Sequence, residues 1–147
     1  LQAGAMQDEW STDFGVGCKY FSQDAVIKLA PYAGIEIPED LSLAQKLKFV
    51  QGLMENDDER AVAIFETIGA YLAYTTVLYS RFYDLDYMML LGRVMSGKGG
   101  DTILRVCNEI LRDEYPELAA KCNVTLPDEK MRRVGQSVAA ASLPEVK

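Results

Sequence analysis

Residues 87–101 read YMMLLGRVMSGKGGD and carry the clearest indication of the fold class. Its first five residues, 87–91, are apolar and run into Gly92. An apolar run of this length that ends at a glycine predicts a buried strand followed by a turn. Asp101 can then cap a helix, because apolar residues recur at helical spacing over 103–111. Strand, glycine turn and helix in this order predict an α/β unit.

Helical spacing and caps also predict the elements on either side of this unit. Ser22 and Ser42 are the expected N-caps of two helices, and Pro31 should end or kink the first of them. The predicted elements are helices at 23–33, 42–54 and 57–81, a short helix ending at Lys121, a strand at 124–126 and a last helix at 128–141. We therefore expect a helix-rich α/β fold over a single domain, 1–147. Two strands are too few for a closed sheet, so further strands would come from a longer chain or a partner.

The longest predicted helix, 57–81, carries fourteen uncharged residues between Glu66 and Arg81. This is short of the roughly 20 residues that a membrane span needs, so a buried core helix is expected and no membrane partner. Within it, Gly69 and two nearby alanines, Ala70 and Ala73, mark positions where a neighbouring backbone can pack closely. Three tyrosines, Tyr71, Tyr74 and Tyr79, are expected in the core, although they could instead stack on a ligand.

Composition limits the chemistry of the chain. Its 147 residues carry 15 Lys and Arg against 22 Asp and Glu, a net charge of -7, and include no histidine. The acidic surplus argues against a nucleic-acid partner, and the missing imidazole removes the usual general base and nucleophile pairs. The three cysteines form no CxxC pair, which predicts reduced, buried or inert thiols and a cytoplasmic protein. Pairs of neighbouring acids are interpreted as helix caps and solvated faces.

The glycine turn has the spacing of a phosphate-binding loop. Residues 92–98 fit GxxxxGK, between a strand and a helix, but Gly99 stands where such a loop needs Ser or Thr to hold Mg²⁺. A true P-loop nucleotide binder is thus disfavoured. A milder interpretation is that the glycines and the following helix N-terminus approach a phosphate or a ribose. The alternative is a solvent-exposed glycine turn with a charged tip.

From residue 61 onward the chain resembles the C-terminal portion of the ROK family of repressors and sugar kinases. The matching stretches are FETIGAYL at 65–72, Tyr83-Asp84, LGRVMSG at 91–97 and GQSVAAASLP at 135–144. The resemblance implies part of an actin-like, ribonuclease H-like ATPase domain that binds ATP, with Mg²⁺, and a sugar in the complete protein. It also implies that Gly92, Ser96 and Gly97 lie near the nucleotide base and ribose.

The resemblance also implies what this chain lacks. Aligning the family's zinc-binding segment on Cys18 places Ser11 and Asp13 where thiolates belong and Tyr20 where an acid belongs, so zinc is not expected. The family's phosphate loop and catalytic aspartate would precede this region. We therefore assign no catalytic residue, and expect the chain alone to be inactive and the parent to be an ATP-dependent sugar kinase. The alternative is a non-enzymatic oligomerisation or ligand-sensing module of a ROK-like regulator.

A homo-oligomer is expected from the count of elements. The helix at 57–81 is apolar over much of its circumference, and the strand at 87–91 offers an uncovered edge. Both features favour association with a second copy.

Overall fold

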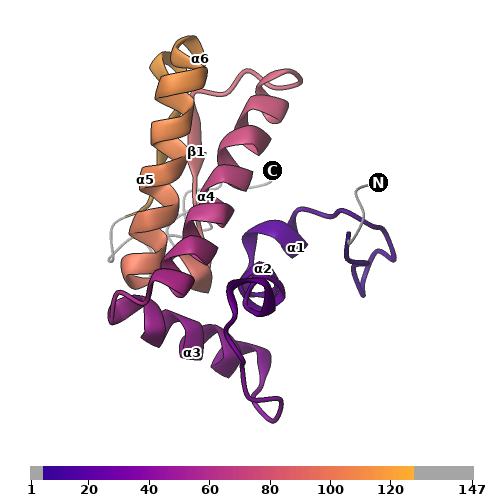
Figure 1. Cartoon of the computed structure of the whole chain (residues 1–147). Coiled ribbons are helices and arrows are strands. Elements are labelled where there is room, and N and C mark those ends of the chain that lie inside the picture. Colours follow the sequence, from indigo (N-terminus) through magenta and orange to yellow (C-terminus); the bar gives the residue numbers. More distant parts are fainter. Residues whose placement is uncertain (1–4, 128–147) are drawn as a thin grey trace, which may run out of the picture.

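The computed structural model describes residues 5–127, and Figure 1 shows them as helices gathered beside a small sheet. In chain order the elements are α1 (Cys18–Phe21), α2 (Gln23–Leu29), the 3₁₀ helix η1 (Pro31–Ala33), α3 (Leu43–Glu55), α4 (Glu59–Ser80), β1 (Tyr87–Met89), the 3₁₀ helix η2 (Arg93–Met95), α5 (Gly97–Glu114), α6 (Pro116–Lys121) and β2 (Asn123–Thr125). Helices contain 62% of the described residues. The predicted helix-rich α/β class is confirmed at this level. The helix expected at 128–141 lies outside the described residues.

Side-chain caps fix where three of the helices begin. The Ser22 hydroxyl caps α2, and Ser42 begins α3 through a reciprocal capping box with Gln45. Asp58 begins α4 by accepting the backbone N–H of Arg60. Such caps satisfy N–H groups that have no partner inside the helix. The two predicted serine caps are therefore confirmed.

Two helix boundaries show how proline and glycine act locally. α2 ends at Leu29, and after the 3₁₀ turn that begins at Pro31, Gly34 adopts a left-handed φ of 71°. The predicted stop is thus confirmed. In contrast, α5 begins at Gly97, four residues before the expected cap at Asp101. The N–H group of Lys98 in its first turn donates to Glu55 of α3, so this helix start does not rely on the capping side chain that the sequence suggested.

α4 and α5 make the principal helix pair and lie side by side along most of their length (Figure 1). They approach closely at Gly69, where an added Cβ would lie 2.9 Å from the carbonyl oxygen of Ile103 and 2.9 Å from Cβ of Val106. The close packing predicted for this glycine is confirmed. The largest fully buried side chains come mainly from these two helices: Phe65, Ile64, Ile68, Ile103, Leu111, Val26, Val50, Thr76 and Cys107.

The sheet has two parallel strands, with Tyr87, Met88 and Met89 paired to Asn123, Val124 and Thr125. The connection between them passes through α5 and α6, as a parallel pair requires. One face is covered, since Val124 is buried, but Tyr87 is 74% exposed and Met89 is 56% exposed. The prediction of a buried strand at 87–91 is therefore wrong for this face. Parallel sheets usually have both faces covered, and the described residues cover one.

α4 is buried along one side only. Its Ile68, Leu72 and Ala73 belong to the core, whereas Tyr71, Tyr74 and Tyr79 are exposed. The prediction that these tyrosines are core residues is wrong, because the side of α4 that faces α5 is filled by smaller aliphatic side chains. Among the described residues, α4 is also the one helix that is long and apolar enough to cross a membrane, judged by length and composition. Just under half of that span is buried inside the protein.

Candidate functional site

The turn after β1 depends on glycine for its backbone shape. Gly92 has φ 117° and ψ 166°, a region that only glycine populates readily, and Gly97 has φ 65°. A glycine at the end of a strand can allow a ligand or a neighbouring backbone to approach closely, but no described neighbouring atom lies within 4 Å of the Cβ position at Gly92. Conformation, not crowding by the described chain, therefore accounts for glycine here.

Two further glycines allow the turn and the start of α5 to pack closely against the core. A Cβ on Gly99 would lie 2.5 Å from the Phe65 ring, and one on Gly100 would lie 2.1 Å from the carbonyl oxygen of Met95. No real Cβ approaches other atoms so closely. Position 99 corresponds to the hydroxyl residue of a phosphate-binding loop. It is glycine here because α5 packs directly on α4.

A carboxylate from α3 lies at the N-terminus of α5, where a P-loop would hold phosphate. The Glu55 carboxylate accepts the backbone N–H of Lys98 at 3.0 Å. The Lys98 ammonium in turn donates to the Asp57 carboxylate at 2.9 Å and to the Glu55 carbonyl oxygen at 3.0 Å. A negative charge is favourable at a helix N-terminus, and in this protein the Glu55 carboxylate provides that charge. The GxxxxGK spacing thus serves a contact between helices and does not build a phosphate site.

A cavity of about 480 Å³ opens beside Gly92, between the turn and the start of α2. This volume falls within the range of small-molecule sites. The apolar side chains of Leu91, Val94 and Phe21 form part of its wall, together with polar or charged groups. The full lining is Cys18, Phe21, Ser22, Gln23, Asp24, Leu91, Gly92, Arg93 and Val94.

The structure separates the three residues that the sequence singled out. Gly92 lines the cavity. Gly97 lies against the Glu55 carboxylate, and a Cβ added to Gly97 would lie 2.5 Å from Oε1 of Glu55. Ser96 lies between them as the N-cap position of α5 and makes no side-chain cap hydrogen bond. Sequence reasoning did not find Arg93 or the α2 residues of this cavity. Arg93 could have been noted, because it directly follows Gly92.

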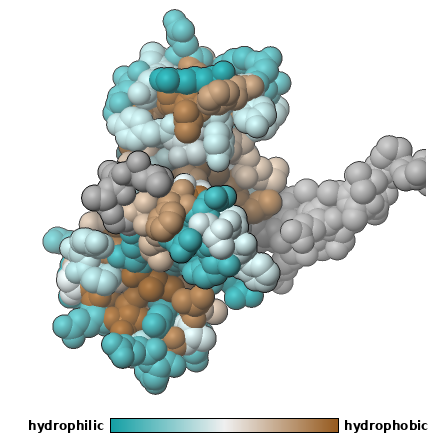
Figure 2. Space-filling view, turned by 90° about the vertical axis from the view of Figure 1, so that its right-hand side faces the viewer, coloured by the Kyte–Doolittle hydropathy of each residue, from teal (hydrophilic) through white to brown (hydrophobic). Residues whose placement is uncertain are grey.

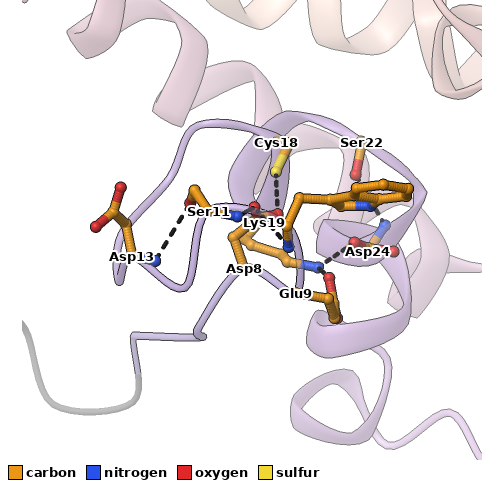
Figure 3. A network of polar contacts seen from close by, with 9 residues as sticks. Asp8, Glu9, Ser11, Asp13, Cys18, Lys19, Ser22 and Asp24 are labelled. Atoms are coloured by element: carbon orange, nitrogen blue, oxygen red, sulfur yellow. Dashed lines mark hydrogen bonds and ion pairs between the residues drawn. The ribbon is translucent and has the colours of Figure 1, made fainter.

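A polar network holds the N-terminal segment on α1 and α2 beside this cavity (Figure 3). The Asp8 carboxylate is buried; it accepts the backbone N–H groups of Trp10 and Ser11 and the thiol of Cys18. These hydrogen bonds, the Ser11 N–H foremost, hold the pKa of Asp8 below its usual value. The prediction that such acids are helix caps or solvated is wrong for Asp8, which organises a loop.

Lys19 is the second centre of the network. Its side chain is 2% exposed, and its ammonium pairs with Asp24 at 2.8 Å and with Glu9 at 2.5 Å. Hydrogen bonds to these carboxylates, with Asp24 the stronger influence, raise the pKa of Lys19. A buried charge needs such partners. Asp24, which lines the cavity, is thereby held in place through the loop.

The three cysteines differ in exposure, and Cys18, on which the zinc-binding segment was aligned, belongs to this network. The sequence predicted buried or inert thiols; Cys18 is not buried, and its pKa is raised by desolvation and by its hydrogen bond to Asp8. Cys107 and Cys122 are buried. Between residues 5 and 127, no group of three His, Cys, Asp or Glu side chains is arranged to hold a metal ion.

Comparison of the chain with protein-family models, with curated proteins and with solved structures gave no match.

Proposed function

We propose that this chain is the C-terminal part of a ROK-like sugar-kinase homologue and that it supplies the adenosine side of an ATP pocket. The observation that carries the proposal is the position of Gly92, at the carboxyl end of a parallel strand and on the wall of a cavity. In open α/β sheets, ligands bind outside the carboxyl ends of the strands. The resemblance at 91–97 agrees with this position. The proposal includes an actin-like fold for the complete protein and a cytoplasmic location.

The chemistry of the cavity suits a nucleoside. Leu91 and Phe21 offer apolar surface to the faces of a base, and the carboxylate of Asp24 can accept hydrogen bonds from ribose hydroxyls. Ser96 and Gly97 lie at the start of α5 and do not line this cavity, so we propose the contact with the nucleoside for Gly92. The described residues do not fit the phosphates or Mg²⁺, because Glu55 already occupies the α5 N-terminus. Those groups would be held by the upstream part of the protein.

A second candidate function is the non-enzymatic module of a ROK-like regulator. It is favoured by the same contact, in which Glu55 and Lys98 close the glycine loop within the chain. The reading frame upstream of residue 1 distinguishes the two functions. A kinase requires an Asp-x-Gly-Gly-Thr phosphate loop and a catalytic aspartate there, and their absence would favour the regulator.

Titration of the ¹⁵N-labelled chain with adenosine tests the pocket directly. We expect amide shifts to change at Gly92, Arg93 and Ser22, while the amide of Gly34, a glycine with positive φ outside this cavity, stays constant. A Gly92→Val variant should lose these changes, and a Gly34→Val variant should keep them. Shifts confined to other parts of the chain, or no shifts at saturating adenosine, would contradict the proposal.

A further inference from the structure

Lys19 is a buried cation beside the cavity that Gly92 lines. Its side chain, in α1, is 2% exposed, and its ammonium donates to Glu9 of the N-terminal segment and to Asp24 of α2. Buried ion pairs of this kind often add no more stability than apolar side chains of the same volume. Stability alone therefore does not explain a lysine at this position, and the neighbouring cavity points to a further role.

Asp24 connects this buried cation to the cavity. Its carboxylate accepts the Lys19 ammonium through Oδ2 at 2.8 Å, and the same residue lines the cavity. Figure 3 shows Lys19 joined to one oxygen of this carboxylate. Within residues 5–127, Oδ1 of Asp24 accepts no hydrogen bond, and no buried side-chain oxygen of those residues is without a partner. Oδ1 is therefore accessible, and it is free to accept a hydrogen bond from a ligand.

The surroundings of Asp24 favour a neutral ligand group that donates hydrogen bonds. Asp24 is the one carboxylate among the described residues that line the cavity, in a chain of net charge -7. A carboxylate only accepts hydrogen bonds, and it repels a phosphate. Figure 2 shows hydrophobic and hydrophilic surface side by side at mid-height, the level of α1 and α2 in Figure 1. Ribose hydroxyls therefore fit next to Asp24, whereas the phosphates of a nucleotide do not.

We infer that Lys19 is a positioning residue, which fixes the Asp24 carboxylate so that Oδ1 accepts hydrogen bonds from the ribose hydroxyls of a nucleoside in the cavity. The inference rests on the proposed function and assigns the recognition of ribose within the same pocket. A side chain that is already fixed loses less conformational entropy on binding than a free one. Glu9 holds Lys19 from the other side, so the N-terminal segment supports the site without lining the cavity.

Titration of the ¹⁵N-labelled chain with adenosine and with 2′,3′-dideoxyadenosine tests the inference, because the two nucleosides differ only in the 2′ and 3′ hydroxyls. Hydrogen bonds to a charged group are worth roughly tenfold or more in affinity, so adenosine should bind at least about tenfold more tightly. Lys19→Met should lower this ratio of affinities roughly two- to tenfold, the cost of immobilising one more side chain. A merely structural role of Lys19 would weaken both nucleosides together and leave the ratio unchanged.

Lys28→Met is the matched control. Lys28 also lies on α2, but its ammonium lies over the Tyr20 ring and it does not line the cavity, so the ratio should stay at its original value. Lys19→Met should fold, because the side chains of Glu9 and Asp24 are 71% and 21% exposed and can be hydrated without Lys19. Circular dichroism checks the fold.

Lys19→Arg serves as a second variant that keeps the buried charge. The longer, planar guanidinium pairs with a carboxylate in a different geometry, so it should displace Asp24 and also lower the ratio. An unchanged ratio in either folded Lys19 variant would overturn the inference and leave the nucleoside pocket in place. Equal affinity of the unmodified chain for the two nucleosides would do the same. Binding of neither nucleoside would contradict the proposed function, and the inference would fall with it.

Discussion

Gly69→Ala is the substitution that tests the helix packing most sharply. An added Cβ would lie 2.9 Å from the carbonyl oxygen of Ile103 and 2.9 Å from Cβ of Val106, whereas carbon atoms in van der Waals contact lie about 3.5–4.0 Å apart. The two helices would have to separate by roughly half an ångström or more. Overpacking of this kind costs about 1–3 kcal/mol. The higher helix propensity of Ala returns about 0.5–1 kcal/mol, so a net loss of about 1–2 kcal/mol is expected.

Gly52→Ala provides the matched control, since Gly52 lies within α3 and no described atom is within 4 Å of its Cβ position. This control should gain about 0.5–1 kcal/mol, because only the propensity changes. Urea unfolding followed by helical circular dichroism measures both variants. A lower free energy of unfolding for Gly69→Ala and a higher one for Gly52→Ala support the packing of α4 on α5. A Gly69→Ala protein as stable as the unmodified chain, or more stable, would refute it.

Three further predictions concern charge, thiols and metal. The pKa of Asp58 is lowered from 3.8 to about 2, chiefly by its hydrogen bond to Arg60; the resulting stability is present above pH 4 and is lost as the pH falls from 4 to 2. The free-energy difference between the unmodified chain and Asp58→Asn, measured by urea unfolding, should shrink over that interval, and a constant difference would contradict this. Of the three thiols, Cys18 should react with a thiol reagent in the folded chain and the two buried cysteines only after unfolding; fast reaction of all three in native buffer would count against the core. Elemental analysis should find no stoichiometric zinc, because Ser11 and Asp13 occupy the aligned thiolate positions; one zinc per chain would overturn the alignment.

Local signals predicted the fold well where one residue decides a boundary. Ser22 and Ser42 act on the nearest backbone N–H groups, and Pro31 restricts its own backbone, so their roles can be deduced from the sequence. The close approach at Gly69 was also predictable, because a glycine within an apolar helix indicates a packed neighbour.

Long-range contacts account for what the sequence did not predict. The start of α5 at Gly97 depends on Glu55, which is more than forty residues away in the chain. The exposure of the α4 tyrosines depends on which side of the helix α5 covers, and helical spacing alone identifies an apolar stripe but not its partner. For the candidate site, glycine at position 92 indicated a special turn, whereas its neighbours from α2 became visible only in three dimensions.

Calorimetry of MgATP binding to the protein encoded by the complete reading frame tests the proposed nucleotide pocket most directly. The unmodified protein, Gly92→Val and Gly34→Val should be compared, because both glycines have positive φ, in different backbone regions, and valine is strained at either position. Only Gly92 lies on the cavity between the turn and α2. We predict that ATP binds to the unmodified protein and to Gly34→Val with similar affinity and that Gly92→Val abolishes binding. Unchanged ATP affinity in a folded Gly92→Val protein would contradict the nucleotide role of this site.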